Sequence, residues 1–340
     1  MKILITGGAG FVGAQLARGL LARPNVAGRP VEHVVLADQY PLSDAAADLA
    51  HDPRVSQRTG PLLGQCEALK GEAFDGVFHL ASAVSGECEL DFELGLRSNL
   101  DSTRALLDAV RASGNAPRFV FSSSIAVFGP DPALQLPARV TDETLPTPQT
   151  SYGTHKLICE HLVADYTRKG FIDGRAVRLN TVTVRPGKPN GAASSFFSGI
   201  IREPLAGVES VCPVNASVSH AVASPARTVE GLIAVFEASR DVFLGRTAMN
   251  LPALNVTVAQ MLAALEEVAG PEVRARVRFE RDERIAGIVA NWPSGVTALR
   301  APRLGLKADE DFASIIRQYI AACRSSGQAS TALKGLPAGH

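Results

Sequence analysis

The sequence predicts an α/β fold, a doubly wound parallel sheet with a smaller C-terminal lobe. Short apolar runs alternate with helical patterns over the first half of the 340-residue chain, a glycine-rich turn joins the first run to the first helix, and the alternation is lost beyond residue 190. Strands that alternate with helices are typical of a parallel sheet with helices on both faces. We expect the sheet domain over residues 1–188, with 220–245 returning to it, the lobe over 189–219 and 246–324, and a tail over 325–340.

The composition argues against several classes of partner. Lys plus Arg and Asp plus Glu both total 34, so the formal net charge is zero and no basic field favours nucleic acid or an acidic membrane surface. Aromatic residues make up 6% of the chain, which is too sparse for a base-stacking platform. No window approaches the ~20 consecutive apolar residues of a membrane helix. We therefore expect a small-molecule partner, no nucleic acid and no membrane.

The N-terminus and the cysteines indicate a cytoplasmic protein. Residues 1–7 form a short apolar run before a glycine turn, which is typical of a strand and not of a secretory signal peptide. The five cysteines are scattered and contain no C-x-x-C pair, as expected for reduced thiols in the cytosol. No spacing such as H-x-x-x-H marks metal ligands, and we expect no metal site.

A glycine turn follows the first predicted strand, Lys2–Thr6, and a helical pattern then runs until Pro24 stops it. In this context Gly7 permits the tight turn, Gly10 lets the backbone approach a pyrophosphate, and Gly13 lets the helix pack against the strand. The helix N-terminus attracts the phosphates. An ordinary strand-to-helix turn would not need three glycines at this spacing. The turn predicts a dinucleotide site formed by Gly7, Gly10, Phe11, Val12 and Gly13.

The second predicted strand, Val31–Ala37, ends at Asp38. An acidic side chain there accepts hydrogen bonds from the adenosine ribose hydroxyls and repels a 2′-phosphate, which favours NAD over NADP. The gap from the glycine turn is longer than usual, and residues 24–30 resemble an insertion that absorbs it. The alternative is that Asp38 is a surface turn residue. A third strand is expected over Val55–Thr59.

The next predicted strand, Phe74–Ala83, ends in small residues. Leu80, Ala81 and Ser82 would allow a bound cofactor to approach the sheet closely. His79 lies inside the apolar run, where a core histidine is expected rather than a ligand. Asn99 opens the helical pattern that follows, and it either caps that helix or supports a catalytic lysine through a water.

Three serines, Ser122 to Ser124, follow the predicted strand Arg118–Phe121. They come at the carboxyl end of a buried strand, which is the edge where α/β sheets bind ligands. The alternative is a turn capped by hydroxyls. The proline-rich segment 130–150 is expected to form a loop over the site.

Tyr152 and Lys156 are four residues apart, so on a helix they lie on the same face. A phenol is a poor base near neutral pH because its ordinary pKa is about 10. A nearby ammonium favours the phenolate and lowers that pKa, which makes the pair a candidate acid/base unit. Chance spacing on an ordinary helix is the alternative. The glycine turn and the serine run supply the context that the spacing lacks.

The second half of the chain has fewer signals. A strand is expected over Ala176–Val184, and the turn beyond it leads into a serine-rich segment. Helical patterns cover Thr228–Ser239, Val258–Ala269 and Asp309–Arg324. Because strand and helix no longer alternate there, we expect a lid or substrate lobe.

Residues 6–13, the serine run and the Tyr152-x-x-x-Lys156 pair together resemble an extended short-chain dehydrogenase/reductase, over residues 1–245. The resemblance implies a Rossmann sheet, NAD as the cofactor and a homodimer. It also implies that Ser124 positions the substrate oxygen and that Tyr152 exchanges its proton. Lys156 would hold the nicotinamide ribose and lower the tyrosine pKa, with Asn99 in support and Ser123 lining the substrate pocket.

The chain departs from the family pattern in two places. The Gly-Asp-Leu that often follows the third strand is replaced by Gly60-Pro61-Leu62, which leaves Leu62 as the expected adenine contact. Phe128 replaces the tyrosine that is common after the serine run.

Residues 184–205 and 211–214 are similar to the D-erythronate dehydrogenase subgroup of that family. The implied reaction is NAD-dependent oxidation of the C2 hydroxyl of a four-carbon sugar acid, D-erythronate, to 2-dehydro-D-erythronate. A small carboxylate needs cationic and hydroxyl donors in a tight pocket. The candidates are Arg185, Lys188, Ser194 and Ser195. For Arg185 and Lys188 a solvated loop or a cofactor contact is the alternative.

Two other functions stay open. A nucleotide-sugar epimerase or dehydratase would use the same Ser-Tyr-Lys triad with tightly bound NAD and a diphosphate in the C-terminal lobe. A non-catalytic NAD-sensing module would keep the glycine turn, but it has no reason to keep Ser124, Tyr152 and Lys156 together.

Overall fold

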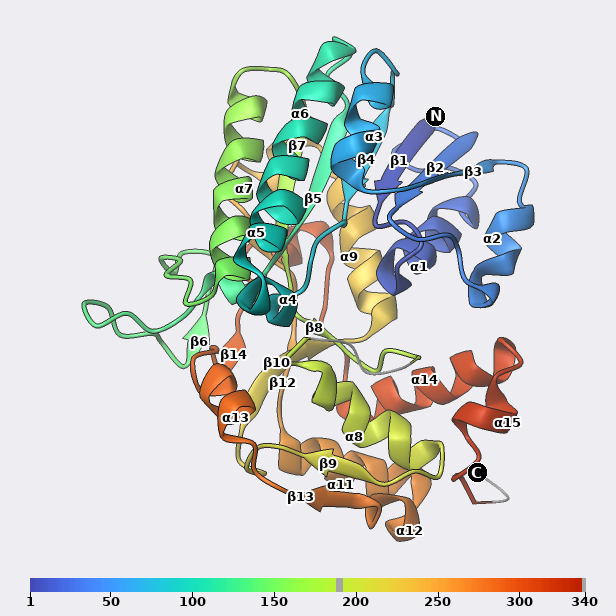
Figure 1. The fold of residues 1–340 in the computed structure, drawn as a ribbon, viewed down its shortest axis with the longest axis vertical. Coiled ribbons are helices and arrows are strands. Elements are labelled where there is room, and N and C mark those ends of the chain that lie inside the picture. The colour runs from blue at the N-terminus through green and yellow to red at the C-terminus, as the bar shows by residue number, and fades with distance from the viewer. Residues whose placement is uncertain (188–191, 338–340) are drawn as a thin grey trace.

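The computed structural model describes residues 1–187 and 192–337, and a seven-stranded sheet forms its centre (Figure 1). The strands lie in the order β11-β7-β5-β4-β1-β2-β3, and all neighbours in this order are parallel. Their bounds are β1 Lys2–Thr6, β2 His33–Asp38, β3 Val55–Thr59, β4 Gly76–His79, β5 Arg118–Ser124, β7 Asp173–Leu179 and β11 Met249–Asn250. The predicted fold class, a doubly wound parallel sheet, is confirmed.

The order of the strands reverses between β1 and β4. From β1 the chain runs outward through β2 to β3, and β4 then begins the other half of the sheet on the opposite side of β1. In open parallel sheets, ligands bind outside the carboxyl ends of the strands at such a switch point. The topology therefore brings the glycine turn after β1 and the small residues after β4 to the same edge.

Helices cover both faces of the sheet, because each has an apolar face to bury. The main ones are α1 Phe11–Leu21 and α9 Pro225–Glu237 on one face and α3 Leu62–Leu69, α6 Ser102–Ala112 and α7 Ser151–Arg168 on the other (Figure 1). Shorter helices lie in the connections: η1 Asp44–Ala46, α2 Ala47–His51, α4 Ser85–Leu90, α5 Phe92–Gly95, η2 Leu96–Asp101, η3 Ile125–Val127 and α10 Arg240–Phe243.

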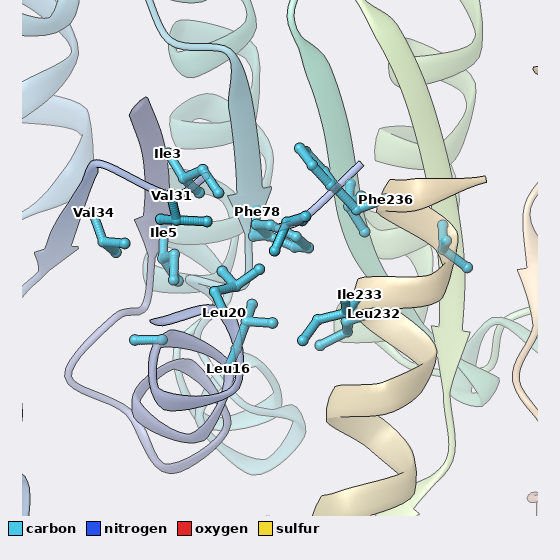
Figure 2. Packing of buried hydrophobic residues seen from close by; sticks show 14 of the residues in the cluster. Ile3, Ile5, Leu16, Leu20, Val31, Val34, Phe78, Leu232, Ile233 and Phe236 are labelled. Carbon is cyan, nitrogen blue, oxygen red and sulfur yellow. The ribbon is translucent and has the colours of Figure 1, made fainter. Parts of the chain in front are cut away.

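Helix α9 packs on the sheet although it is far from it in sequence. Figure 2 shows Leu232, Ile233 and Phe236 of α9 directed toward Phe78 of β4 and toward the side chains of α1. The Phe78 and Phe236 rings stack with centroids 4.9 Å apart. A Cβ atom on Gly76 would lie 2.4 Å from the Phe236 ring, so this glycine makes room for the stack. Burial of these aromatic faces ties residues 225–237 to the sheet.

The remaining elements form a smaller lobe below the sheet in Figure 1. Its strands pair as β12-β10-β8, β13-β9 and β14-β6. Their bounds are β6 Arg139–Val140, β8 Thr181–Val182, β9 Ser210–Cys212, β10 Ser219–Ala223, β12 Leu254–Thr257, β13 Val277–Phe279 and β14 Gly295–Val296. The helices are α8 Ser195–Leu205, α11 Val258–Ala269, α12 Pro271–Arg274, α13 Glu283–Ala290, α14 Phe312–Ser325 and α15 Ala329–Ala332. The short helix η4, Ala301–Leu304, instead packs with α10 against the core of the sheet domain. Helices α8, α11 and α14 share an apolar core of their own.

Three expectations differ from the structure: the extent of one strand, the C-terminal tail and the position of Asn99. The strand predicted over Ala176–Val184 is divided at Asn180, where the chain leaves the large sheet as β7 and enters the lobe as β8. The predicted tail contains α15, and Leu333 is buried against the lobe core, because this small-residue segment packs on α8. The amide of Gly335 donates to the Leu205 carbonyl over 2.8 Å.

Asn99 does not open a helix, so the expectation that it caps one is wrong. It lies in the π-helical turn η2, inside an unbroken helical stretch from Phe92 to Ala112, and its side chain is buried. Single π-helical turns inside α-helices are frequent at functional sites. No helix in the described ranges is both long and apolar enough to cross a bilayer.

Candidate active site

A cavity of about 270 Å³ opens at the carboxyl ends of β4 and β5, with walls from both the sheet and the lobe. Of the residues predicted from the sequence, it is lined by Val12, Leu80, Ser82, Ser123, Ser124, Tyr152, Lys156, Arg185 and Ser194. The topology thus brings together residues that are up to 182 positions apart in the chain (194 minus 12).

The glycine turn has the shape of a phosphate cradle. Gly7 has a φ of +70°, and a Cβ atom there would lie 2.8 Å from the Ala81 amide nitrogen. A Cβ atom on Gly13 would lie 2.1 Å from the Gly7 carbonyl oxygen, so only glycine fits. Helix α1 begins after Gly10 without a side-chain cap, and its first amides remain to bind an anion. Phe11 is in the first turn of α1 and is half-buried. This cradle fits the pyrophosphate of a dinucleotide.

Asp38 ends β2 beside the glycine turn. Its carboxylate accepts hydrogen bonds from the amides of Ala9, over 3.0 Å, and Tyr40, over 3.1 Å. These bonds hold the carboxylate at the edge of the cradle, where a ribose would lie. Leu62 begins α3 after the third strand. Its side chain packs against the apolar cluster between the sheet and the helices α3 and α6.

His79 is a buried core residue, as the sequence predicts. Its Nδ1 is 2.6 Å from the Thr6 hydroxyl and its Nε2 is 2.8 Å from the Thr103 hydroxyl. Burial lowers the pKa of His79 to about 3, so the ring is neutral. Both nitrogens have partners, and the side chain joins β1 and β4 to the helical segment that carries Asn99.

Asn99 holds the loop that follows β4. Its Oδ1 accepts from the Ala83 amide over 2.7 Å and from the Ser82 hydroxyl over 3.1 Å, and its Nδ2 donates to the Ala83 carbonyl over 3.2 Å. Ser82 and Ala83 line the cavity, while Leu80 and Ala81 lie at the end of β4 against Gly7. The buried amide therefore shapes the cofactor side of the cavity.

Ser124 and Tyr152 meet at the centre of the cavity. The Ser124 oxygen accepts from the Ala126 amide over 3.1 Å, and its hydroxyl lies near enough to the Tyr152 phenol to act on the phenol pKa. Burial raises the pKa of Tyr152 to about 12, while the Ser124 hydroxyl and the positive charge of Arg185 act in the opposite direction. The phenol is therefore protonated in the protein as it stands.

Lys156 is buried one turn along α7 from Tyr152. Its ammonium donates to the Ser122 carbonyl over 2.8 Å and lies 5.5 Å from the centre of the Tyr152 ring and 5.0 Å from that of Phe121. Burial lowers the pKa of Lys156 to about 8, and nearby Cys159, Cys88 and Glu160 oppose that shift. We expected Lys156 to lower the tyrosine pKa, but its charge is directed to the strand carbonyl, and burial of the phenol dominates.

Ser123 faces a buried ion pair. Its hydroxyl donates to Glu160 over 2.5 Å, and the Glu160 carboxylate also accepts two hydrogen bonds from Arg178, at 2.9 and 2.8 Å. The sequence assigned Ser123 to the substrate pocket. Although the residue lines the cavity, its hydroxyl is directed to Glu160 and ties β5 to α7.

Of the predicted acid-binding residues, Arg185 and Ser194 line the cavity. Arg185 is close enough to Tyr152 to lower the phenol pKa, and burial lowers the pKa of its own guanidinium. Ser194 lines the cavity, and Ser195 begins α8 next to it. Lys188 lies outside the described residues. The described ranges contain no group of three or more His, Cys, Asp or Glu that would hold a metal ion.

Sequence reasoning missed several residues of the lobe wall, among them Thr181, His220 and Trp292. These three come from β8, β10 and the segment before β14, and no local motif surrounds them. Only the tertiary fold brings them to the cavity.

Comparison with known proteins identifies the family. Residues 3–217 match the model of the NAD dependent epimerase/dehydratase family. The chain belongs to this family. It is similar to the D-erythronate dehydrogenases of Cupriavidus necator, with 47% identity over 94% of this chain and 98% of the relative, and of Haemophilus influenzae, with 42% identity over 94% and 99%. A solved structure titled as a nucleoside-diphosphate-sugar epimerase from Agrobacterium tumefaciens superposes with a TM-score of 0.87, at 44% identity and 94% coverage of both chains.

Family membership agrees with the geometry of the cradle. The chain is an NAD-dependent oxidoreductase, and NAD is its cofactor. Its glycine turn, its uncapped α1 N-terminus and its Asp38 carboxylate are the groups that fit the pyrophosphate and the ribose.

We expect Lys156→Met to change how stability depends on pH. Between pH 8 and 10.5 the unfolded lysine keeps a proton that the folded lysine has released, so wild-type stability rises with pH across this window. The variant lacks this rise. Its free energy of unfolding should therefore lose about 2–3 kcal/mol relative to that of wild type between pH 7 and pH 10. Urea unfolding at a series of pH values measures it. Lys307→Met, at an exposed position, is the control and should follow wild type. Parallel curves for Lys156→Met and wild type would refute the assignment.

Asp38→Asn should weaken NAD binding and relax the discrimination against NADP. The amide keeps an acceptor for the Ala9 amide but removes the negative charge, and a hydrogen bond to a charged group contributes about 1.5–3 kcal/mol, which is tenfold or more in Kd. Fluorescence titration with both nucleotides measures the two affinities. Asp44→Asn, on the exposed η1 helix, is the matched control. An unchanged ratio of the two affinities would remove Asp38 from the cofactor site.

Proposed function

We propose that the chain oxidises the C2 hydroxyl of a four-carbon sugar acid, D-erythronate, to 2-dehydro-D-erythronate. The observation that carries this proposal is the near full-length similarity to two D-erythronate dehydrogenases. The cavity supports it, because about 270 Å³ is at or below the lower end of the ~300–1,000 Å³ that is usual for ligand pockets. Such a volume suits a small acid.

Ser124, Tyr152 and Lys156 would carry the proton chemistry. Ser124 and Tyr152 line the same cavity, and the serine hydroxyl is near enough to affect the phenol, so a substrate hydroxyl placed there could contact both oxygens. Tyr152, after releasing its phenol proton to solvent, would take up the hydroxyl proton, and NAD, when bound, would accept the C2 hydride. The positive charge of Arg185 favours the phenolate that this step requires, and the Lys156 ammonium lies 5.5 Å from the centre of the phenol ring.

The carboxylate of the acid would bind to Arg185. This guanidinium is next to Tyr152, and the carboxylate of the substrate is one bond from the reacting C2. A charge-assisted bond from Arg185 would thus fix C2 against the phenol. Ser194 would add a hydroxyl, and Ser195 and Lys188 remain candidates nearby. In this proposal, residues 189–219 and 246–324 form the substrate lobe and residues 1–188 with 220–245 the NAD domain.

A nucleotide-sugar epimerase is the second candidate, and one observation favours it: the solved Agrobacterium tumefaciens structure bears that title. An epimerase must also hold a nucleoside diphosphate in the lobe. Its product forms without net NADH, so turnover separates the two functions.

We infer that the protein is a cytoplasmic homodimer. The five cysteines are free and buried, which supports a reducing compartment. Leu90 of α4, Phe92 of α5 and Ile158 of α7 are exposed, at 85%, 57% and 38%, on helices that contact one another. An apolar surface of this kind supports a helical dimer interface.

The test of the proposed reaction is NADH formation, followed at 340 nm, with D-erythronate, L-threonate, UDP-glucose and UDP-galactose. We expect NADH with D-erythronate. Tyr152→Phe should lose at least 10²–10⁴-fold in kcat, because the variant cannot take the proton. It should bind NAD as wild type does, which titration of the protein with NAD would confirm.

Two results would overturn the proposal. Conversion of a UDP-sugar together with no reaction of any acid would assign the chain to the epimerase branch. Wild-type turnover by Tyr152→Phe would remove the tyrosine from the mechanism.

The dimer is tested by the double substitution Leu90→Asp and Phe92→Asp. Because two carboxylates would be buried in the interface, we expect the particle to change from dimer to monomer. Analytical ultracentrifugation measures the mass. Phe279→Asp, at a position 46% exposed in the lobe, is the control and should remain dimeric. A wild-type monomer, or an unchanged mass in the double variant, would exclude this interface.

A further inference from the structure

Three histidines are buried in the described part of the chain, His79, His155 and His220. His155 also has a buried Nδ1 without a partner, but it does not line the active-site cavity. The other two differ in their partners. His79 and His220 are 0% and 2% exposed. Both nitrogens of His79 are bonded to threonine hydroxyls. His220 bonds only through Nε2, which lies 2.7 Å from the Thr181 hydroxyl, and its buried Nδ1 has no hydrogen-bond partner in the described part of the chain. A buried polar atom left unpaired in this way costs about 1–3 kcal/mol.

His220 lies in the lobe wall of the active-site cavity, and its ring is held in place. The imidazole stacks on Phe197, with centroids 4.8 Å apart and an interplanar angle of 1°. Trp292 packs near it, with centroids 5.0 Å apart. Thr181, His220 and Trp292 all line the cavity. A ring fixed by two aromatic neighbours and one hydrogen bond keeps its second nitrogen in one direction, as a recognition group requires.

The charge state of His220 restricts its ligand. Burial lowers the pKa of the imidazole to about 3, so the ring is neutral at any working pH of the enzyme. A neutral ring offers one N–H and one bare nitrogen, which suits a hydroxyl group. A carboxylate would instead be bound better by the guanidinium of Arg185, on the Tyr152 side of the same cavity.

We propose that Nδ1 of His220 binds a hydroxyl group of the sugar acid beyond the reacting carbon, at C3 or C4, and thereby selects hydroxylated acids over their deoxy analogues. With the carboxylate on Arg185 and the C2 hydroxyl on Ser124 and Tyr152, these are the hydroxyls that remain. The inference rests on the proposed function and deepens it, since it assigns the part of the substrate that the catalytic triad does not contact.

The test compares kcat/KM for D-erythronate with kcat/KM for its 3-deoxy and 4-deoxy analogues. A site built to bond a hydroxyl rejects the analogue that lacks it, because its own polar group is then left unpaired. We expect wild type to prefer D-erythronate over one of the two analogues by about 10² or more. His220→Gln and His220→Phe should reduce that preference to within about tenfold, mainly by losing activity on D-erythronate.

His220→Asn is the matched variant. The amide nitrogen of asparagine lies near the position of Nδ1, whereas that of glutamine lies near Nε2 and reaches Thr181 instead. His220→Asn should therefore keep the preference that His220→Gln loses. Thermal unfolding and NAD titration of each variant show that it is folded, and the Asn and Gln pair decides the question if the Phe variant does not fold.

The outcomes separate the two proposals. If wild type oxidises no acid, the proposed function fails and this assignment fails with it. Two other results would leave His220 with only a structural role while the proposed function stands. In the first, wild type oxidises D-erythronate but shows no preference for it over either analogue. In the second, the His220→Gln and His220→Phe variants lose activity equally on all three acids.

Discussion

The buried ammonium of Lys156 is the constraint on which the active site depends. Removing a charge from water is costly, and the depressed pKa of this lysine records the cost. The surrounding structure offsets part of it. The Ser122 carbonyl accepts a hydrogen bond, the face of Phe121 lies 5.0 Å away, and Glu160 is near enough to favour the charged form. These partners come from β5 and α7, so the strand and the helix must pack in one register for the lysine to be held.

The Glu160–Arg178 pair fixes that register. Arg178 of β7 makes two hydrogen bonds to Glu160 of α7, and Ser123 of β5 makes a third. A buried pair of this kind contributes little net stability but specifies one arrangement, because any other leaves a charge unpaired. The pair itself is neutral, because the charge of Arg178 is balanced by Glu160. Lys156 and Arg185 are the cations that line the cavity, and a field of that sign attracts an anionic acid.

The features that the sequence predicted are those encoded within a few residues. The glycine turn and the Tyr152–Lys156 spacing follow from the geometry of a turn and of a helix, and both are found where expected. Asn99 was misplaced, because a π-helical turn has no distinct sequence pattern. Ser123 lines the cavity, as expected, but the bond from its hydroxyl to Glu160 was not predicted because the two residues are 37 positions apart. His220 gave no signal, since the residues that give it meaning, Phe197 and Trp292, meet it only in the folded lobe.

Chemistry and selectivity are therefore encoded in different parts of the chain. Ser124, Tyr152 and Lys156 are positioned by the parallel sheet, whose core is closed by α9 on one face and α7 on the other. The opposite wall of the cavity depends on α8, β10 and the segment before β14, which pack around the separate apolar core of the lobe. Substitutions in that lobe can change the shape and polarity of the wall without disturbing the buried lysine. This separation accounts physically for a family in which dehydrogenases of small acids and epimerases of nucleotide sugars share one fold.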